Sequence, residues 1–153
     1  MEFKSLKLDH VGLRVTDLAT AEAFYAKFGF ARDPEEFSQE SKACGLVHPS
    51  GLRIHLIFNG EAAPEGNVLL DSDVKRPGYT HAAFIIDNME ELTSWLNQEG
   101  IGITEGPVIL GDGRRSTCFI RDPDKNVVEF NQILLEPPPA PPEPPIRAAH
   151  ARA

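Results

Sequence analysis

Hydrophobic and polar positions follow the same order twice along this chain. Residues 7–15 alternate with the two-residue period of a strand, and residues 18–28 then take the period of a helix. The same change of period returns at residues 79–86 and 88–98. The pattern therefore predicts a strand followed by a helix in each half of the chain.

Shorter alternating segments, separated by turn-forming residues, follow each helix. These segments predict strands at 30–37, 42–48, 52–59, 102–109, 115–121 and 127–134. The order is βαβββ in both halves, which indicates an α+β fold of two modules. A single such module leaves one sheet face and one edge uncovered. We therefore expect the two modules to form one curved eight-stranded mixed sheet with the helices outside.

The predicted elements divide the chain into a domain and a tail. Residues 7–59 form module one, residues 60–78 a polar connector and residues 79–134 module two, within a domain at 1–135. The remaining residues, 136–153, begin with EPPPAPPEPP. Proline cannot donate a backbone hydrogen bond, and the segment has almost nothing apolar to bury, so we expect a disordered tail.

Composition excludes some classes of partner. The net charge of −8 argues against nucleic acid and anionic membranes as binding partners. No apolar run is long enough to cross a membrane, and the N-terminus does not resemble a signal peptide. The two cysteines, Cys44 and Cys118, form no metal or redox motif, which favours buried, reduced thiols. We therefore expect a cytoplasmic protein with a small-molecule substrate.

Four side chains that can bind a metal stand at equivalent points of the repeat. His10 and His81 open the first strand of each module, and His55 and Glu129 lie in the last strand. Glu129 is flanked by apolar residues, and a carboxylate placed in this way is costly to bury unless it is paired or bound to a metal. Imidazole and carboxylate together suit Zn²⁺, Ni²⁺, Fe²⁺, Mn²⁺ or Co²⁺. The set predicts one shared divalent metal site, although each histidine alone could be structural.

Several motifs carry a resemblance to a known family. The segments are DHVGLRVTDLATAEAFYAKFGF, IHLIFN, YTHAAFIID and RDPDKNVVEF. Together they resemble the vicinal oxygen chelate superfamily, over about residues 7–134. This superfamily includes glyoxalase I, extradiol dioxygenases and bleomycin-resistance proteins. The resemblance implies a homodimer in which module one of one subunit faces module two of the other. It also implies that the metal ligands are His10, His55, His81 and Glu129.

Within that superfamily the local pattern resembles bacterial glyoxalase I. Arg14 lies four residues after the first ligand position and Asn59 four residues after the second, where that family contacts glutathione. The implied activity is that of a lactoylglutathione lyase, which isomerises a glutathione hemithioacetal through an enediolate. Glu129 and His55 are the implied catalytic residues. His55 departs from the family pattern, which has a carboxylate at this position, so only Glu129 remains as a carboxylate base.

Two alternatives lead to different chemistry. In an Fe(II) ring-cleaving dioxygenase of the extradiol type, His10, His81 and Glu129 would form a facial triad, and His55 would serve as an acid or base beside it. In a metal-free drug-binding protein of the bleomycin-resistance type, the same fold would bind a ligand without catalysis. Such a protein is not expected to keep all four donors. Metal binding separates this last interpretation from both enzymes.

Overall fold

Two modules with the same order of elements make up the computed structural model, which describes residues 6–62, 66–111 and 113–135. The predicted tail at 136–153 lies outside the described residues. Module one contains β1 (Val11–Arg14), α1 (Leu18–Ala26), β2 (Ala31–Ser38), β3 (Ala43–Val47) and β4 (Arg53–Ile57). Module two contains β5 (His81–Ile86), α2 (Met89–Gln98), β6 (Ile103–Leu110), β7 (Arg115–Arg121) and β8 (Val127–Ile133). The predicted α+β fold with two βαβββ modules is confirmed.

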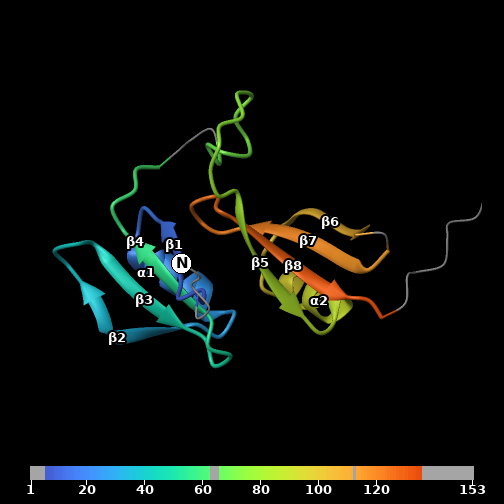
Figure 1. Ribbon diagram of the computed structural model, residues 1–153, viewed down its shortest axis with the longest axis horizontal. Helices are drawn as coiled ribbons and strands as arrows, with labels where there is room; N and C mark the ends of the chain where they lie inside the picture. The colour runs from blue at the N-terminus through green and yellow to red at the C-terminus, as the bar shows by residue number, and fades with distance from the viewer. Residues whose placement is uncertain (1–5, 63–65, 112, 136–153) are drawn as a thin grey trace, which may run out of the picture.

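Each module builds its own four-stranded mixed sheet. The strand orders are β1-β4-β3-β2 and β5-β8-β7-β6, so the two sheets have the same topology. The first and last strands of each module are parallel, and the other pairs are antiparallel. The eight predicted strands therefore occur as two sheets within the described chain, because no hydrogen-bonded ladder there joins the edge strands β1 and β5 (Figure 1).

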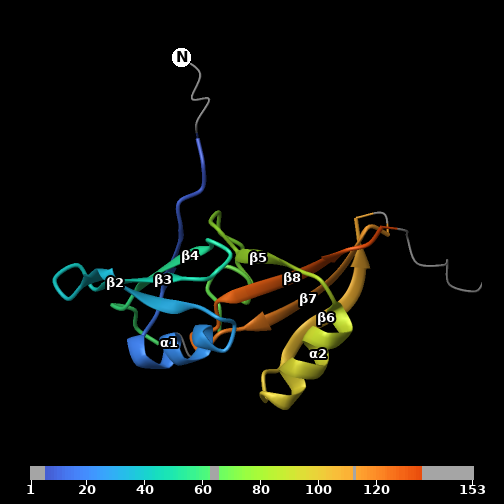
Figure 2. The ribbon, with the colours of Figure 1, turned by 90° about the horizontal axis from the view of Figure 1, so that it is seen from below.

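The helices begin and end where the sequence supplies capping residues. The Asp17 side chain accepts a hydrogen bond from the backbone N–H of Thr20 at 2.8 Å, which satisfies a free donor at the start of α1. Asn88 caps α2 in the same way. Gly29 and Gly100 follow the two helices with φ of +87° and +68°, a conformation that glycine adopts without strain. Both helices lie on one side of the sheets (Figure 2).

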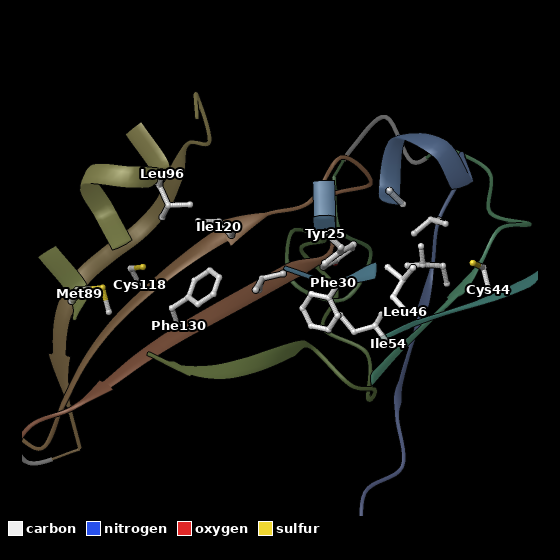
Figure 3. Close-up of a cluster of buried hydrophobic side chains, with 14 residues drawn as sticks. Tyr25, Phe30, Cys44, Leu46, Ile54, Met89, Leu96, Cys118, Ile120 and Phe130 are labelled. Atoms are coloured by element: carbon white, nitrogen blue, oxygen red, sulfur yellow. The ribbon is translucent and has the colours of Figure 1, made fainter. Parts of the chain in front are cut away.

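One hydrophobic core extends through both modules. Buried residues from the two halves pack in a single cluster, which includes Phe30 and Ile54 from module one and Leu96 and Phe130 from module two (Figure 3). The ring of Phe28 lies 5.5 Å from that of Phe130 and 5.1 Å from that of Trp95, between centroids. Because these aromatic contacts cross from one module to the other, the modules stabilise each other.

A turn of module two contacts both α1 and the β1–α1 connection of module one. The hydroxyl of Tyr25, which is 1% exposed, donates to Asp122 Oδ2 at 2.9 Å. Asp124 Oδ1 accepts hydrogen bonds from the backbone N–H and the hydroxyl of Thr16 at 3.1 and 2.6 Å. Burial raises the pKa of Asp122, and burial together with this carboxylate holds the pKa of Tyr25 well above its ordinary value. The turn between β7 and β8 therefore fixes the relative position of the modules.

Candidate metal centre

The four predicted metal ligands occupy equivalent places in the two sheets. His81 is the first residue of β5, whereas His10 lies one residue before β1, although the strand predicted at 7–15 includes it. In the parallel ladders, Gly12 is paired with His55 and Ala83 with Glu129. The second donor of each module is therefore paired with the residue two positions after the first histidine. The β-ladders thus bring the donors together as two matching pairs.

Strand alternation turns both second donors away from the core. Ile54 and Leu56, which flank His55, are 2% and 0% exposed, and His55 itself is only half-buried. Val128 and Phe130 are buried on either side of Glu129 in the same way. Since successive side chains of a strand point to opposite faces, both donors lie on the sheet face that does not carry the core and the helices.

The module-one pair consists of two stacked imidazole rings. The rings of His10 and His55 lie 3.7 Å apart between centroids and are inclined by only 9°. Nδ1 of His10 is 2.7 Å from Asp9 Oδ2, and this hydrogen bond lowers the pKa of Asp9. A carboxylate that holds one ring nitrogen in this way leaves the other nitrogen of a neutral ring free to bind a metal. For His10 the free nitrogen is Nε2.

The second histidine of that pair contacts a carboxylate that was not predicted from the sequence. Nε2 of His55 lies 2.8 Å from Oε2 of Glu36 on β2. Glu36 also forms an ion pair with Arg53, and the guanidinium holds the pKa of Glu36 below its ordinary value, with His55 adding to the effect. Arg53 contacts Asp33 at 3.1 Å as well. Glu36 belongs to the acidic segment DPEEFSQE, in which nothing local distinguishes it from solvent-exposed neighbours.

The module-two pair joins an imidazole and a carboxylate. Nε2 of His81 lies 2.7 Å from Oε2 of Glu129. The other oxygen, Oε1, accepts a hydrogen bond from Asn131 Nδ2 at 2.8 Å, and Asn131 Oδ1 in turn accepts one from the Thr117 hydroxyl at 2.7 Å. Thr117 and Asn131 are 0% and 3% exposed. This buried network holds the carboxylate by one oxygen and leaves the other directed at His81.

The two pairs remain separate within one chain. Among the residues that the structure describes, no group of three or more histidine, cysteine, aspartate or glutamate side chains is arranged so that it could hold a metal ion. The structure therefore brings His10 together with His55, and His81 together with Glu129, but not all four. In donor chemistry each pair fits half of a divalent metal site.

One of the two predicted substrate contacts shares a cavity with a predicted metal ligand. Arg14 ends β1, is exposed, and lines a cavity of about 190 Å³ together with Thr80 and His81. Asn59 follows β4 and is exposed, but it is not among the residues that line this cavity. Arg14 thus shares a cavity with one predicted metal ligand, His81, whereas Asn59 does not line that cavity.

Comparison with known proteins identifies the family. The sequence profile described as the Glyoxalase/Bleomycin resistance protein/Dioxygenase superfamily matches residues 7–130. The chain belongs to this superfamily. Its members include glyoxalases and dioxygenases, so the resemblance noted in the motifs is confirmed at the level of the superfamily.

A curated relative and two solved structures are similar to this chain. The virulence protein STM3117 of Salmonella typhimurium is 30% identical over 136 residues, which cover 84% of this chain and 85% of that protein. A glyoxalase family protein from Enterococcus faecalis superposes with a TM-score of 0.65 at 25% identity, covering 86% of this chain and 99% of that chain. A glyoxalase/dioxygenase from Nostoc punctiforme shares the fold with a TM-score of 0.66 at 19% identity, covering 84% and 91%.

Neither described helix could cross a membrane. With nine residues in α1 and ten in α2, both are far shorter than an apolar membrane-spanning helix. The described part of this superfamily member therefore contains no membrane-spanning helix.

Proposed function

We propose that the chain is a metal-dependent, glyoxalase-I-like enzyme. Its substrate would be a small molecule with oxygen atoms on two neighbouring carbon atoms, such as a glutathione hemithioacetal. The observation that supports this proposal is the matching placement of His10 with His55 and of His81 with Glu129 in the two ladders. Three imidazoles and one carboxylate suit Zn²⁺, Ni²⁺, Co²⁺, Fe²⁺ or Mn²⁺, and the donors leave coordination positions for a substrate.

The proposed site requires a second copy of the chain. Each module offers two of the four predicted donors, and the two pairs do not converge within the described chain. A homodimer in which module one faces module two of the partner would place both pairs around one metal ion, twice per dimer. The exposed side of β5 supports this arrangement, because Ile85 lies on the same face as His81 and is 75% exposed. An apolar side chain in that position favours burial against a partner.

Each residue has a distinct part in the proposed reaction. A bound divalent metal would supply Lewis-acid stabilisation of negative charge on the two substrate oxygens. Glu129 would accept and return the proton that moves between adjacent carbons, since Asn131 fixes only one of its oxygens and the other, Oε2, faces His81 at the proposed site. Arg14 would bind a carboxylate of the substrate, because a guanidinium forms paired hydrogen bonds with such a group. Asn59 would add a second polar contact to the thiol-containing part of the substrate.

One contact favours a second candidate function. Because the Glu36 carboxylate lies on Nε2 of His55, His55 could form an acid–base pair with Glu36 instead of binding the metal. His10, His81 and Glu129 would then be the two histidines and one carboxylate of an Fe(II) ring-cleaving dioxygenase. The two candidates differ in substrate, in metal and in the role of His55.

Activity assays after metal loading test the proposal. The purified chain should bind a divalent metal and isomerise the hemithioacetal of methylglyoxal and glutathione. Replacement of Glu129 by glutamine should abolish turnover, whereas the same change at the exposed Glu90 should leave it intact. Turnover of catechols alone, after anaerobic loading with Fe(II), would replace the first candidate by the second. Absence of affinity for every divalent metal would contradict both and leave metal-free ligand binding.

A further inference from the structure

Glu36 reaches His55 through an opening that only glycine provides. Gly45 on β3 is paired with His55 in the ladder between β3 and β4. A Cβ atom at position 45 would lie 2.4 Å from Oε2 of Glu36 and 2.7 Å from its Cβ. Any side chain there would therefore displace the Glu36 carboxylate from its position against His55.

Module two has no such opening. Its ladder between β7 and β8 pairs Phe119 with Glu129, so phenylalanine stands where module one has Gly45. The ring of Phe119 contacts His81, with 6.0 Å between centroids. Only in module one, therefore, does the glycine leave room for a carboxylate to reach the donor pair from the neighbouring strand. Module one is also the module that has a histidine, His55, where module two has the carboxylate of Glu129.

Glu36 contacts the edge of the His55 ring from which a metal would be bound. In the other two predicted histidine ligands, Nδ1 contacts a neighbouring side chain, Asp9 for His10 and Thr80 for His81. Nε2 of His81 faces Glu129, which is itself a predicted ligand. The Nε2 edge is therefore the edge that faces the proposed metal site in both cases. Glu36 lies on the corresponding edge of His55, at 2.8 Å.

We propose that Glu36 is a second carboxylate of the metal site and binds the ion together with His55. This inference rests on the proposed metal-dependent function. Three imidazoles and Glu129 alone would leave a divalent ion with a formal charge of +1, and Glu36 makes the site neutral. Arg53 orients Glu36 from its other oxygen, and Asp33 provides Arg53 with a second acidic partner. Arg53 therefore keeps a carboxylate partner when Glu36 turns toward a metal.

Titration of the 153-residue chain with Co²⁺, monitored by visible absorption, tests this role. Glu36→Gln removes the charge, and Gly45→Ala displaces the carboxylate without removing it. Both variants should bind Co²⁺ at least about tenfold more weakly than the wild type and show an altered absorption spectrum, which reports the ligand set. Thermal unfolding of the metal-free variants, close to that of the wild type, would show that the fold is intact.

Two further variants separate this role from simple neutralisation of Arg53. Asp33→Asn removes the other carboxylate from Arg53 without touching His55, and Glu35→Gln changes the exposed neighbour. Both should bind Co²⁺ as tightly as the wild type. Equal or tighter binding by Glu36→Gln, in a wild type that binds the metal, would overturn the role of Glu36 alone. A wild type that binds no Co²⁺, Zn²⁺, Ni²⁺, Mn²⁺ or Fe²⁺ would overturn the proposed function and this inference together.

Discussion

The two modules have the same framework but support their donor pairs in different ways. In module two, Glu129 is held by Asn131 and Thr117, which are almost completely buried. In module one, His55 contacts Glu36, which is half-buried and comes from a different strand. The repeated fold therefore determines where the donors stand, while the residues around each donor determine how firmly it is held. Module two is the more preorganised half of the site.

The largest expected effect tests whether the modules fold as one unit. Phe30→Ala in module one and Phe130→Ala in module two should each lower the free energy of unfolding by about 3–5 kcal/mol, because both rings are buried in the shared core. Urea unfolding should show one transition by circular dichroism and by the fluorescence of Trp95, the single tryptophan. A second unfolding transition, or a loss of stability confined to one module, would contradict the conclusion that the two modules share one core.

The next prediction separates the two kinds of donor support. Asn131→Leu should lower the free energy of unfolding by about 1–3 kcal/mol, since it leaves the buried hydroxyl of Thr117 without its acceptor. It should also weaken metal binding about tenfold by releasing Glu129. Glu36→Gln should weaken metal binding without a measurable loss of stability, because its side chain is 34% exposed. Equal losses of unfolding free energy in the two variants, measured by urea unfolding, would contradict the proposal that module two holds its donor more firmly than module one.

A smaller effect concerns the turn that joins the modules. Burial raises the pKa of Asp122 above its ordinary value of 3.8, so the folded state binds its proton more tightly than the unfolded state. The contribution of Asp122 to the free energy of unfolding should therefore fall as pH rises from 3.8 through the raised pKa. Asp122→Asn, which keeps an acceptor for Tyr25, should remove this fall. Urea unfolding at acidic and neutral pH would measure this fall, with the exposed Asp87→Asn as the control. If the free energy of unfolding changed with pH in the same way in the wild type and in Asp122→Asn, the predicted contribution of Asp122 would be contradicted.

The smallest expected effect is local to α2. Asn88 accepts hydrogen bonds from the backbone N–H groups of Glu90 and Glu91 at 2.9 and 3.2 Å. Asn88→Ala should lower the free energy of unfolding by about 1 kcal/mol. The neighbouring Asp87→Ala, which removes no cap, should change it much less. Equal effects of the two substitutions would argue against the capping role.

The sequence pattern was sufficient to predict the order of strands and helices, because periodicity is a local property. The switch from strand to helical period at Asp17 and Asn88 coincides with the caps of α1 and α2. The flanking apolar residues likewise predicted the face on which His55 and Glu129 lie. The division into two sheets was not predicted, since pairing between β1 and β5 depends on how the modules pack and not on the pattern of either strand.

The supporting residues of the site depend on contacts between strands. Glu36 faces His55 only because β2 changes register between Arg32 and Phe37 and because Gly45 leaves room on β3. Asn131 lies two residues after Glu129, and strand alternation alone could have indicated that both share a face. Gly45 is paired with His55, whereas Phe119 occupies the equivalent position in module two. This difference can be recognised only once the register of the strands is known.

Mixing of two inactive variants tests the shared site most directly. One variant carries His10→Ala and His55→Ala, and the other carries His81→Ala and Glu129→Ala, so each destroys one pair. Neither alone should bind a divalent metal tightly. After joint unfolding and refolding in equal amounts, the mixture should recover about one quarter of the wild-type capacity, because half of randomly formed dimers are mixed and each contains one intact site of two. No recovery, in a mixture shown by native mass spectrometry with one isotope-labelled variant to contain mixed dimers, would contradict a site built from module one of one subunit and module two of its partner.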